Sequence, residues 1–311
     1  MKKTMDFDKM ILDAYPLDDY EADRAKHGRI TLTKEIERRS LCEGVEFREC
    51  LYTRGDGVEV YVYITTISPD APVQLAVSAS PVHTAKCVKQ HASDFENAFG
   101  EKVLYAMNAS YFHFFNNGDL SPYGIQIVRG VEMSLPVSGE NEDKPWYSHN
   151  FVAVDKSGKA FISNSDEFYK TYRGKLEYAV GGGCRLIRNG EIRLHHNPVC
   201  APRTTVGFAS DGTTILMCAD GRSARSGGIY HADTVDIYTH LGYEIVELLN
   251  LDGGGSTTVV LREDDGSFKV RNVPSGPPLP ISYGKYGITL PEPRGEEQVR
   301  VVADAILIVE K

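Results

Sequence analysis

The feature that most constrains this chain is an apolar run that ends in a carboxylate and three glycines. Residues 243–249 form the run, and residues 250–256 then read Asn-Leu-Asp-Gly-Gly-Gly-Ser. Glycine has no Cβ, so its backbone can adopt positive φ and a ligand can approach its amide closely. A tight turn into the strand-like residues 257–261 would need only one or two glycines. The pattern therefore predicts a binding site in which amide donors lie near Asp252.

The composition is that of an ordinary globular protein, and its length suits one large domain. The chain has 311 residues, of which 41% are hydrophobic and 25% are charged, both usual proportions for a folded domain. The formal net charge of −9 argues against a nucleic-acid partner, because binding a phosphate backbone needs a concentrated basic surface. No run reaches the roughly 20 apolar residues that a membrane span requires.

The N-terminal residues bear on the compartment in which the protein works. Two lysines stand near the start, but Asp6 and Asp8 interrupt any apolar stretch of a secretory signal. We expect a cytoplasmic protein as the sequence stands, or a secreted one if a signal peptide has been removed from it. The six cysteines include no CxxC pair, which argues against a zinc ribbon or a thioredoxin-type site.

Strand patterns dominate the chain and predict an α+β fold, with one large domain whose mixed, mainly antiparallel sheet is flanked by a few helices. Helices are expected at 84–99 and 230–241, each followed by a glycine that suits a C-cap. Strands are expected at 58–64, 73–77, 103–107, 123–128, 150–154, 178–188, 203–209, 214–219, 245–249 and 301–309.

Two segments fall outside this pattern. Residues 1–55 are charge-mixed and poorly periodic, with a short helix within 20–39. We interpret them as an N-terminal extension that packs on the main domain, residues 56–311. Residues 273–293 are rich in proline and are expected to form a long surface loop that could act as an active-site flap.

Polar residues stand at the ends of several predicted strands, where a folded sheet would gather them at one edge. Arg203 and Arg222 offer planar guanidinium groups that suit a phosphate or a carboxylate. Asp220 and Asp252 offer carboxylates for acid–base chemistry, a covalent role or a metal ion. Asp-Gly at 220–221 is also a common hairpin signal, so a surface turn remains the alternative there.

Ca²⁺ or Mg²⁺ would suit these carboxylates, although the sequence shows no cofactor that is required and no clustered metal motif. The amides of Asn108 and Asn250 suit sugar hydroxyls. The predicted catalytic residues are Asp252 and Asp220, and the predicted substrate-binding residues are Asn108, Arg203, Thr204, Arg222, Asn250, Gly253, Gly254, Gly255 and Ser256.

These residues lie in motifs that resemble those of the phosphodiester glycosidase family, which includes bacterial proteins linked to exopolysaccharide. Asn-Ala-Ser-Tyr-Phe at 108–112 is similar to the family's Asn-Gly-x-Tyr-Phe element, with Ala109 in place of its usual glycine. Further elements follow in the family's order: a glycine-rich strand at 181–190, an Arg-Thr element at 201–207, an Asp-Gly-Arg turn at 220–228, the Asp-Gly-Gly-Gly loop at 249–258 and a closing strand at 300–308.

The resemblance covers roughly residues 70–310. Residues 1–55 have no counterpart in the family, and the proline-rich residues 276–298 look inserted, so the range of substrates is expected to differ.

The resemblance implies a hydrolase that cleaves a sugar-1-phosphodiester and releases free sugar and a phosphomonoester. The substrate would be a small molecule or an oligosaccharide that carries phosphate. Arg203, Arg222 and the amides of 253–255 would hold the phosphate, while Asp252 or Asp220 would act as base or nucleophile. The alternative is a non-catalytic carbohydrate-binding or exopolysaccharide assembly protein that keeps the site without turnover.

Overall fold

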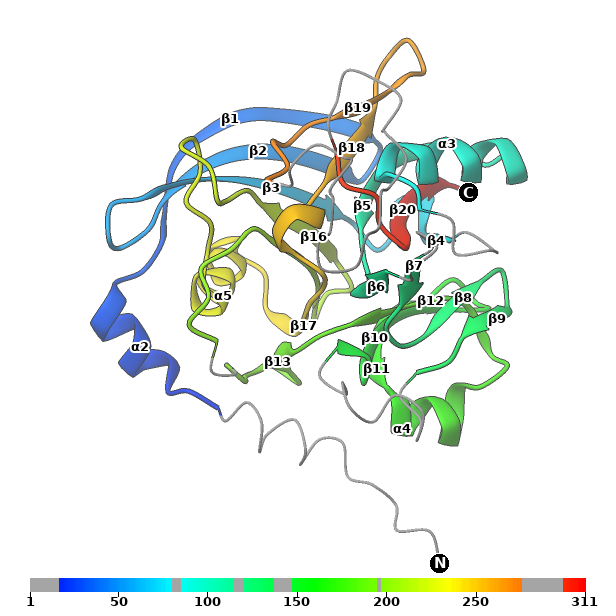
Figure 1. Ribbon diagram of the computed structural model, residues 1–311, viewed down its shortest axis with the longest axis horizontal. Helices are drawn as coiled ribbons and strands as arrows, with labels where there is room; N and C mark the ends of the chain where they lie inside the picture. Colours follow the sequence, from blue (N-terminus) through cyan, green and yellow to red (C-terminus); the bar gives the residue numbers. More distant parts are fainter. Residues whose placement is uncertain (1–16, 80–84, 115–119, 137–146, 195–196, 276–298) are drawn as a thin grey trace, which may run out of the picture.

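Antiparallel sheets make up most of the protein (Figure 1). The computed structural model describes residues 17–79, 85–114, 120–136, 147–194, 197–275 and 299–311. Within these ranges every pair of neighbouring strands is antiparallel. The predicted α+β class is confirmed, but the strands are shared among several sheets instead of one.

The largest sheet has eight strands and carries most of the predicted site. In spatial order they are β1 (Thr31–Cys42), β2 (Val45–Thr53), β3 (Glu59–Ile67), β16 (Thr214–Ala219), β15 (Arg203–Ala209), β17 (Ile245–Asn250), β13 (Arg185–Arg188) and β14 (Glu191–Ile192). β15 and β16 are buried along their whole length. The helix α5 (His231–His240) covers one face, where Val235 and Tyr238 pack with Met217 of β16.

A second sheet lies beside the first and has five strands, β19 (Phe268–Val270), β18 (Val259–Arg262), β5 (Val103–Asn108), β20 (Asp304–Glu310) and β4 (Val73–Ala79). The helix α3 (Val88–Phe99) packs on it through Val88, Ala92 and Phe95. Gly100 ends this helix in the left-handed conformation, as predicted.

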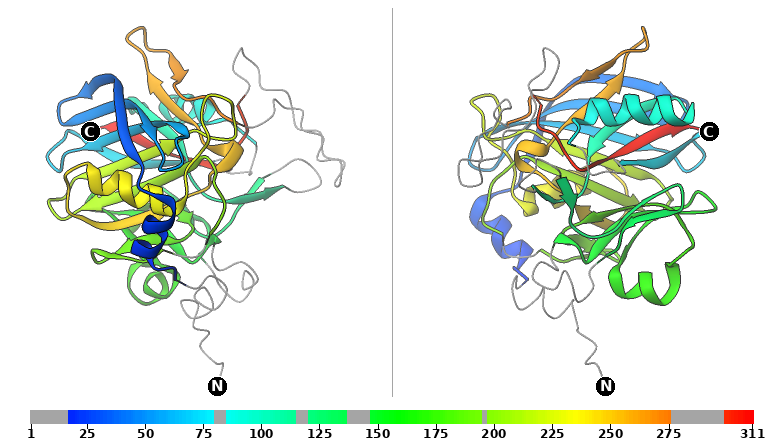
Figure 2. Two further views of the ribbon diagram at one scale, coloured as in Figure 1. Left: turned by 90° about the vertical axis from the view of Figure 1, so that its left-hand side faces the viewer. Right: turned by 45° about the vertical axis from the view of Figure 1, so that its right-hand side comes forward.

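The third sheet also has five strands, and a small hairpin lies next to it (Figure 2). The sheet contains β11 (Ala160–Asn164), β10 (Asn150–Asp155), β12 (Leu176–Gly182), β8 (Gln126–Val128) and β9 (Val131–Ser134). The hairpin is β6 (Phe112–Phe114) with β7 (Leu120–Pro122), and α4 (Ser165–Glu167) continues into a π-helix at Phe168–Tyr172.

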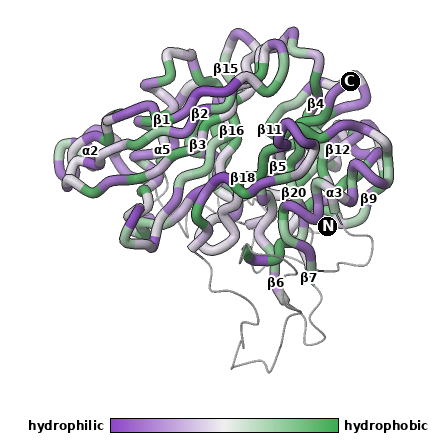
Figure 3. Tube along the Cα trace, turned by 90° about the horizontal axis from the view of Figure 1, so that it is seen from above, coloured by the Kyte–Doolittle hydropathy of each residue, from purple (hydrophilic) through white to green (hydrophobic). Residues whose placement is uncertain are grey.

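One hydrophobic core joins the three sheets and so fixes their relative positions. Leu216 and Leu249 of the first sheet pack in the same cluster as Met107 and Ile306 of the second and Val180 of the third. Hydrophobic residues are concentrated along β5 and β20 at the centre of the molecule (Figure 3). The strand ends that carry the predicted site are therefore held by a close-packed interior.

The N-terminal segment differs from its prediction. The helix α2 (Tyr20–His27) occupies the first part of the segment 20–39 in which a short helix was expected, and it ends at Gly28, which has φ of 73°. Residues 31–53 form β1 and β2, which the sequence analysis missed. In β1 both faces are largely exposed, so apolar and polar residues do not alternate along it. The boundary proposed at residue 55 falls between β2 and β3, which pair along their length; the division into two domains stays a prediction.

The helix α2 lies against α5 (Figure 2), and a buried ion cluster joins the two helices. Arg24 is 4% exposed, and its Nη1 donates to Asp233 at 2.7 Å and to Asp236 at 2.8 Å. Arg29 and Tyr20 also contact the Asp236 carboxylate. The first described helix is thus tied to residues more than 200 positions away in the sequence.

Most other predicted elements are confirmed with small shifts of their ends. The strand expected at 178–188 is divided into β12 and β13. The last strand begins at Asp304, not at residue 301, and α3 begins at Val88, after the undescribed residues 80–84. The proposed flap lies largely outside the described residues, which end at 275 and resume at 299.

Candidate active site

Strand ends from two sheets meet at the predicted site. Asn108 at the end of β5 pairs with Ala305 of β20 in one sheet. In the other sheet, Arg203 opens β15 and Asn250 closes β17, one strand away. The sheets are linked by a hydrogen bond from Asn108 Nδ2 to the carbonyl of Asp252 at 2.6 Å. Residues far apart in the sequence are therefore brought to one place.

The Asn108 side chain fixes the glycine-rich loop. Its Oδ1 accepts hydrogen bonds from Thr204 Oγ1 at 2.9 Å and from the Thr258 amide at 3.1 Å. Asn108 and Thr204 are both fully buried. Because both ends of the Asn108 amide are engaged, this geometry favours a positioning role over contact with a sugar hydroxyl.

Asp252 is the half-buried carboxylate at the centre of the site. Its backbone amide donates to Ala109 O at 2.9 Å. Burial raises the pKa of its carboxyl to about 7, although a hydrogen bond from the Ser256 side chain and the positive charge of Arg300 act in the opposite direction. A carboxyl group with a pKa near neutrality can take up or release a proton under ordinary conditions.

The glycines next to Asp252 are required by close neighbours. A Cβ on Gly253 would lie 2.5 Å from the carbonyl oxygen of Pro202. Gly254 has φ of 61°, and a Cβ there would lie 2.9 Å from Nη1 of Arg222. The Gly254 amide donates to Pro202 O at 2.9 Å, so it is already engaged within the protein. The loop continues as a 3-10 helix at Gly254–Ser256, in which Gly255 and Ser256 are buried.

Arg203 and Arg222 place two positive charges beside this loop. Arg203 is 7% exposed and donates from Nη2 to Val199 O at 2.6 Å. Burial lowers its pKa, and the charge of Arg222 lowers it further. Arg222 is exposed and adopts φ of 57°. Neither arginine forms an ion pair with any described residue, which leaves both charges available to an anion.

Asp220 is buried in a hydrogen-bond network of its own. Its carboxylate accepts from Asn272 Nδ2 at 2.8 Å, from the Val273 amide at 3.0 Å and from the Tyr63 hydroxyl at 3.3 Å. Asn272 Nδ2 also donates to Thr257 O at 2.9 Å. Asp220 thus supports the residues that follow the glycine loop, and its oxygens are occupied by protein donors.

The structure adds three residues that sequence analysis did not select. Arg300 and Asp304 lie close enough to Asp252 for their charges to shift its pKa, Arg300 downward and Asp304 upward. The Asp304 carboxylate accepts a hydrogen bond from the Ser110 amide at 2.8 Å, and the residue is buried at the start of β20. Tyr111 accepts from Asn250 Nδ2 at 2.7 Å. All three lie in motifs that the sequence had singled out, Tyr111 in the element at 108–112 and the other two in the closing strand at 300–308.

The predicted metal ion has no obvious cluster of ligands in the described ranges. No three His, Cys, Asp or Glu side chains come together there in a way that would hold a metal ion, and Ca²⁺ or Mg²⁺ binding stays a prediction. The described helices include none that is long and apolar enough to cross a membrane.

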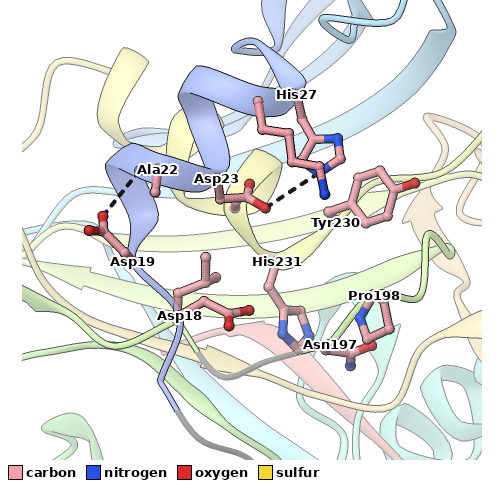
Figure 4. A pocket seen from close by; sticks show the side chains of 12 residues that line it. Asp18, Asp19, Ala22, Asp23, His27, Asn197, Pro198, Tyr230 and His231 are labelled. Carbon is pink, nitrogen blue, oxygen red and sulfur yellow. Dashed lines mark hydrogen bonds and ion pairs between the residues drawn. The ribbon is translucent and has the colours of Figure 1, made fainter.

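A separate cavity lies between α2 and the start of α5 (Figure 4). Its volume is about 550 Å³, and Asp18, Asp23, His27, Tyr230 and His231 are among the residues that line it. Asp23 Oδ1 lies 3.9 Å from His27 Nε2. None of the predicted site residues lines this cavity, so it is distinct from the cluster around Asp252.

Solved structures share this fold at low sequence identity. The catalytic domain of zebrafish N-acetylglucosamine-1-phosphodiester alpha-N-acetylglucosaminidase, in a form auto-inhibited by its pro-peptide, superposes with a TM-score of 0.59 and 19% identity over 97% of this chain and 93% of that chain. A hypothetical protein from Synechocystis gives a TM-score of 0.54 and 16% identity over 90% of this chain and 64% of that chain.

A putative exported protein from Burkholderia pseudomallei K96243 gives a TM-score of 0.51 and 13% identity over 81% of this chain and 74% of that chain. Among curated proteins, the SPbeta prophage-derived uncharacterized protein YomE of Bacillus subtilis (strain 168) is 35% identical over 75 residues, which are 24% of this chain. The chain spans only 11% of the length of that relative.

The family comparison covers the site itself. The sequence profile of the phosphodiester glycosidase family matches residues 101–286, which is more than half of the chain. The matched segment contains Asn108, Arg203, Arg222 and Asp252. The chain therefore belongs to the phosphodiester glycosidase family.

Proposed function

We propose that the protein hydrolyses a sugar-1-phosphodiester and releases free sugar and a phosphomonoester. The observation that carries this proposal is that Arg203 and Arg222 lie against the glycines that follow Asp252, a residue whose carboxyl has a pKa of about 7. This carboxyl group suits proton transfer at neutral pH. The two guanidinium groups suit the phosphate of the substrate.

In the proposed reaction, water attacks the anomeric carbon while Asp252 accepts its proton. The new bond joins the water oxygen to the anomeric carbon, and the bond between that carbon and the phosphate oxygen breaks. The phosphomonoester leaves with the bonding electrons. A phosphate is a good leaving group, so charge stabilisation matters more than a strong general acid. Arg203 and Arg222 supply this stabilisation, and a preorganised donor contributes about 3–4 kcal/mol.

Asp252 is proposed as a general base in preference to a nucleophile. A nucleophilic carboxylate works best when it is fully ionised, whereas burial keeps the pKa of Asp252 at about 7 and makes it a better proton acceptor. Asp220 is proposed as a positioning residue, because three protein donors occupy its carboxylate.

The test is incubation of the purified protein with sugar-1-phosphodiesters, including uridine-diphosphate sugars, followed by assay of free reducing sugar. We expect release by the wild-type protein and loss of release in Asp252→Asn, with an unchanged circular dichroism spectrum. Asp265→Asn is the matched control, since Asp265 is exposed in a turn between β18 and β19. Tight sugar binding without release would favour the carbohydrate-binding alternative.

A further inference from the structure

We propose that Asn250 and Tyr111 together recognise one hydroxyl group of the substrate's sugar. This inference rests on the proposed function and defines the part of the site that selects the sugar. It follows from an unused acceptor on Asn250 that lies next to an unused donor on Tyr111.

The orientation of the Asn250 amide is fixed by its neighbours. Nδ2 donates to Leu251 O at 2.8 Å and to the Tyr111 hydroxyl at 2.7 Å. A carbonyl oxygen can only accept, so the nitrogen of the amide must face Leu251. Oδ1 has no hydrogen-bond partner among the described residues. Asn250 is 2% exposed, and a buried acceptor without a donor is costly.

The Tyr111 hydroxyl supplies the complementary group. It accepts the hydrogen bond from Asn250, so its own proton must point elsewhere, and no described residue accepts that proton. Burial raises the pKa of Tyr111 well above its usual value, the charge of Asp252 raises it further, and Arg203 opposes the shift. The phenol therefore stays protonated, and it lies within electrostatic reach of both the proposed base and the phosphate-binding arginine.

The Tyr111 ring is held rigidly in this position. The ring of Tyr147 packs against it with centroids 4.4 Å apart. A Cβ on Gly183 would lie 3.0 Å from Cε2 and 3.3 Å from the hydroxyl oxygen of Tyr111. The last glycine of the run at 181–183 is thus explained by the approach of Tyr111, and it gives the recognition pair a fixed geometry.

A sugar hydroxyl matches this pair because it donates and accepts at once. Its proton would bond to Asn250 Oδ1, and its oxygen would accept the proton of Tyr111. A deoxy sugar leaves both protein groups buried without partners, and a site built to bind a hydroxyl rejects such an analogue strongly. The preferred substrate is therefore a sugar with a free hydroxyl at one defined ring position.

The experiment measures binding by isothermal titration calorimetry, independently of turnover. A panel of hexose 1-phosphates is titrated into wild-type protein, and the best ligand is compared with its monodeoxy derivatives. We expect one deoxy position to weaken binding by about 10- to 100-fold, the loss typical of a buried polar group left unpaired. In Tyr111→Phe, the intact sugar and that deoxy sugar should bind within about threefold of each other.

Two further variants separate recognition from general damage. Gly183→Ala keeps the Tyr111 hydroxyl but displaces its ring, and it should abolish the same discrimination. Tyr147→Phe keeps the ring contact with Tyr111, so this variant should still discriminate between the intact sugar and the deoxy sugar. Three outcomes would overturn the inference. Wild-type protein could bind all deoxy derivatives equally, it could bind no hexose 1-phosphate, or the discrimination could survive in Tyr111→Phe. Hydroxyl selectivity without hydrolysis would leave the inference standing and refute the proposed function instead.

Discussion

Asp220 follows β16 and Asp252 follows β17, two strands of one sheet that are separated by β15, yet their surroundings give the two carboxyl groups different properties. The Asp252 carboxyl is half-buried, has a pKa of about 7 and lies within electrostatic reach of Arg300 and Tyr111. Asp220 accepts three hydrogen bonds from its own protein. From the sequence, either could serve as the base; the difference arises only from the atoms packed around them.

The pH dependence of catalysis follows from Asp252. A general base must be ionised, and the ionised fraction of Asp252 rises as pH passes through its pKa of about 7. We expect kcat/KM to increase between about pH 6 and 8 and then to level off. A pH–rate profile checks this. A decrease through the same range would instead identify Asp252 as an acid.

Replacing Asp252 should increase stability while it removes activity. The folded-state pKa of about 7 lies above the ordinary value of about 4 for an unfolded Asp. Ionisation therefore destabilises the fold above pH 7, and this cost disappears as pH falls toward 4. At pH 8 we expect Asp252→Asn to raise the free energy of unfolding by about 1–3 kcal/mol.

The measurement is urea unfolding of both proteins at pH 8 and at pH 5. The difference between them should shrink at the lower pH, where wild-type Asp252 is largely protonated. If Asp252→Asn were less stable than wild type at pH 8, this would contradict a raised pKa of Asp252.

Replacing Asp220 should have the opposite effects: it should reduce stability more than it reduces activity. Asp220→Ala leaves Asn272, Val273 and Tyr63 without their shared acceptor, so we expect a loss of about 2–4 kcal/mol in the free energy of unfolding. Once corrected for the folded fraction, kcat should fall less than it does in Asp252→Asn. Thermal unfolding and single-turnover kinetics check these two statements. A fully folded but inactive Asp220→Ala would restore Asp220 as a catalytic residue.

At the scale of elements, the site depends on the loop between β17 and β18. Asn108 bonds both to the start of this loop and to Thr258 near its end, and Pro202 accepts the Gly254 amide within it. The loop is therefore a rigid connection between two sheets. Its shape explains why three glycines follow Asp252: each of the first two has a neighbour that a Cβ would meet.

Gly254→Ala should weaken phosphate binding specifically. A Cβ at φ of 61° and 2.9 Å from Arg222 Nη1 strains the backbone and displaces the guanidinium. We expect KM for a phosphodiester to rise about tenfold, equivalent to about 1.4 kcal/mol. Gly266→Ala is the control: it has φ of 84° but lies in the turn between β18 and β19. Equal effects of the two substitutions would show that strain alone is responsible.

Strand existence and the site motifs could be predicted from the sequence, whereas pairing and hydrogen bonding could not. β15 and β16 were recognisable because they are continuous runs of strand-forming residues. β1 was missed because both of its faces are largely exposed, so apolar and polar residues do not alternate along it. Asn108 was correctly expected near Asp252, but its amide bonds to Thr204 and to the Asp252 backbone, which only the folded contacts reveal.

At the scale of the whole molecule, the N-terminal helix is part of the folded unit. Arg24 is buried between Asp233 and Asp236 of α5. We expect Arg24→Met to reduce the free energy of unfolding by about 3–5 kcal/mol, because removing one partner of a buried ion cluster leaves unpaired charge. Lys26→Met, at an exposed position of the same helix, should change it by less than about 0.5 kcal/mol. Chemical denaturation of both variants checks this.

The pairing of β2 with β3 has a practical consequence for anyone who shortens the protein. A chain that begins at residue 56 would lose β1 and β2 and leave β3, a strand rich in valine, isoleucine and tyrosine, as a bare margin of the largest sheet. An exposed edge strand can pair with a strand of another chain and so cause aggregation. In the full chain, β1 and β2 cover this edge, and the lysine, glutamate and arginine residues of β1 oppose such pairing. We therefore expect a chain that begins at residue 56 to aggregate.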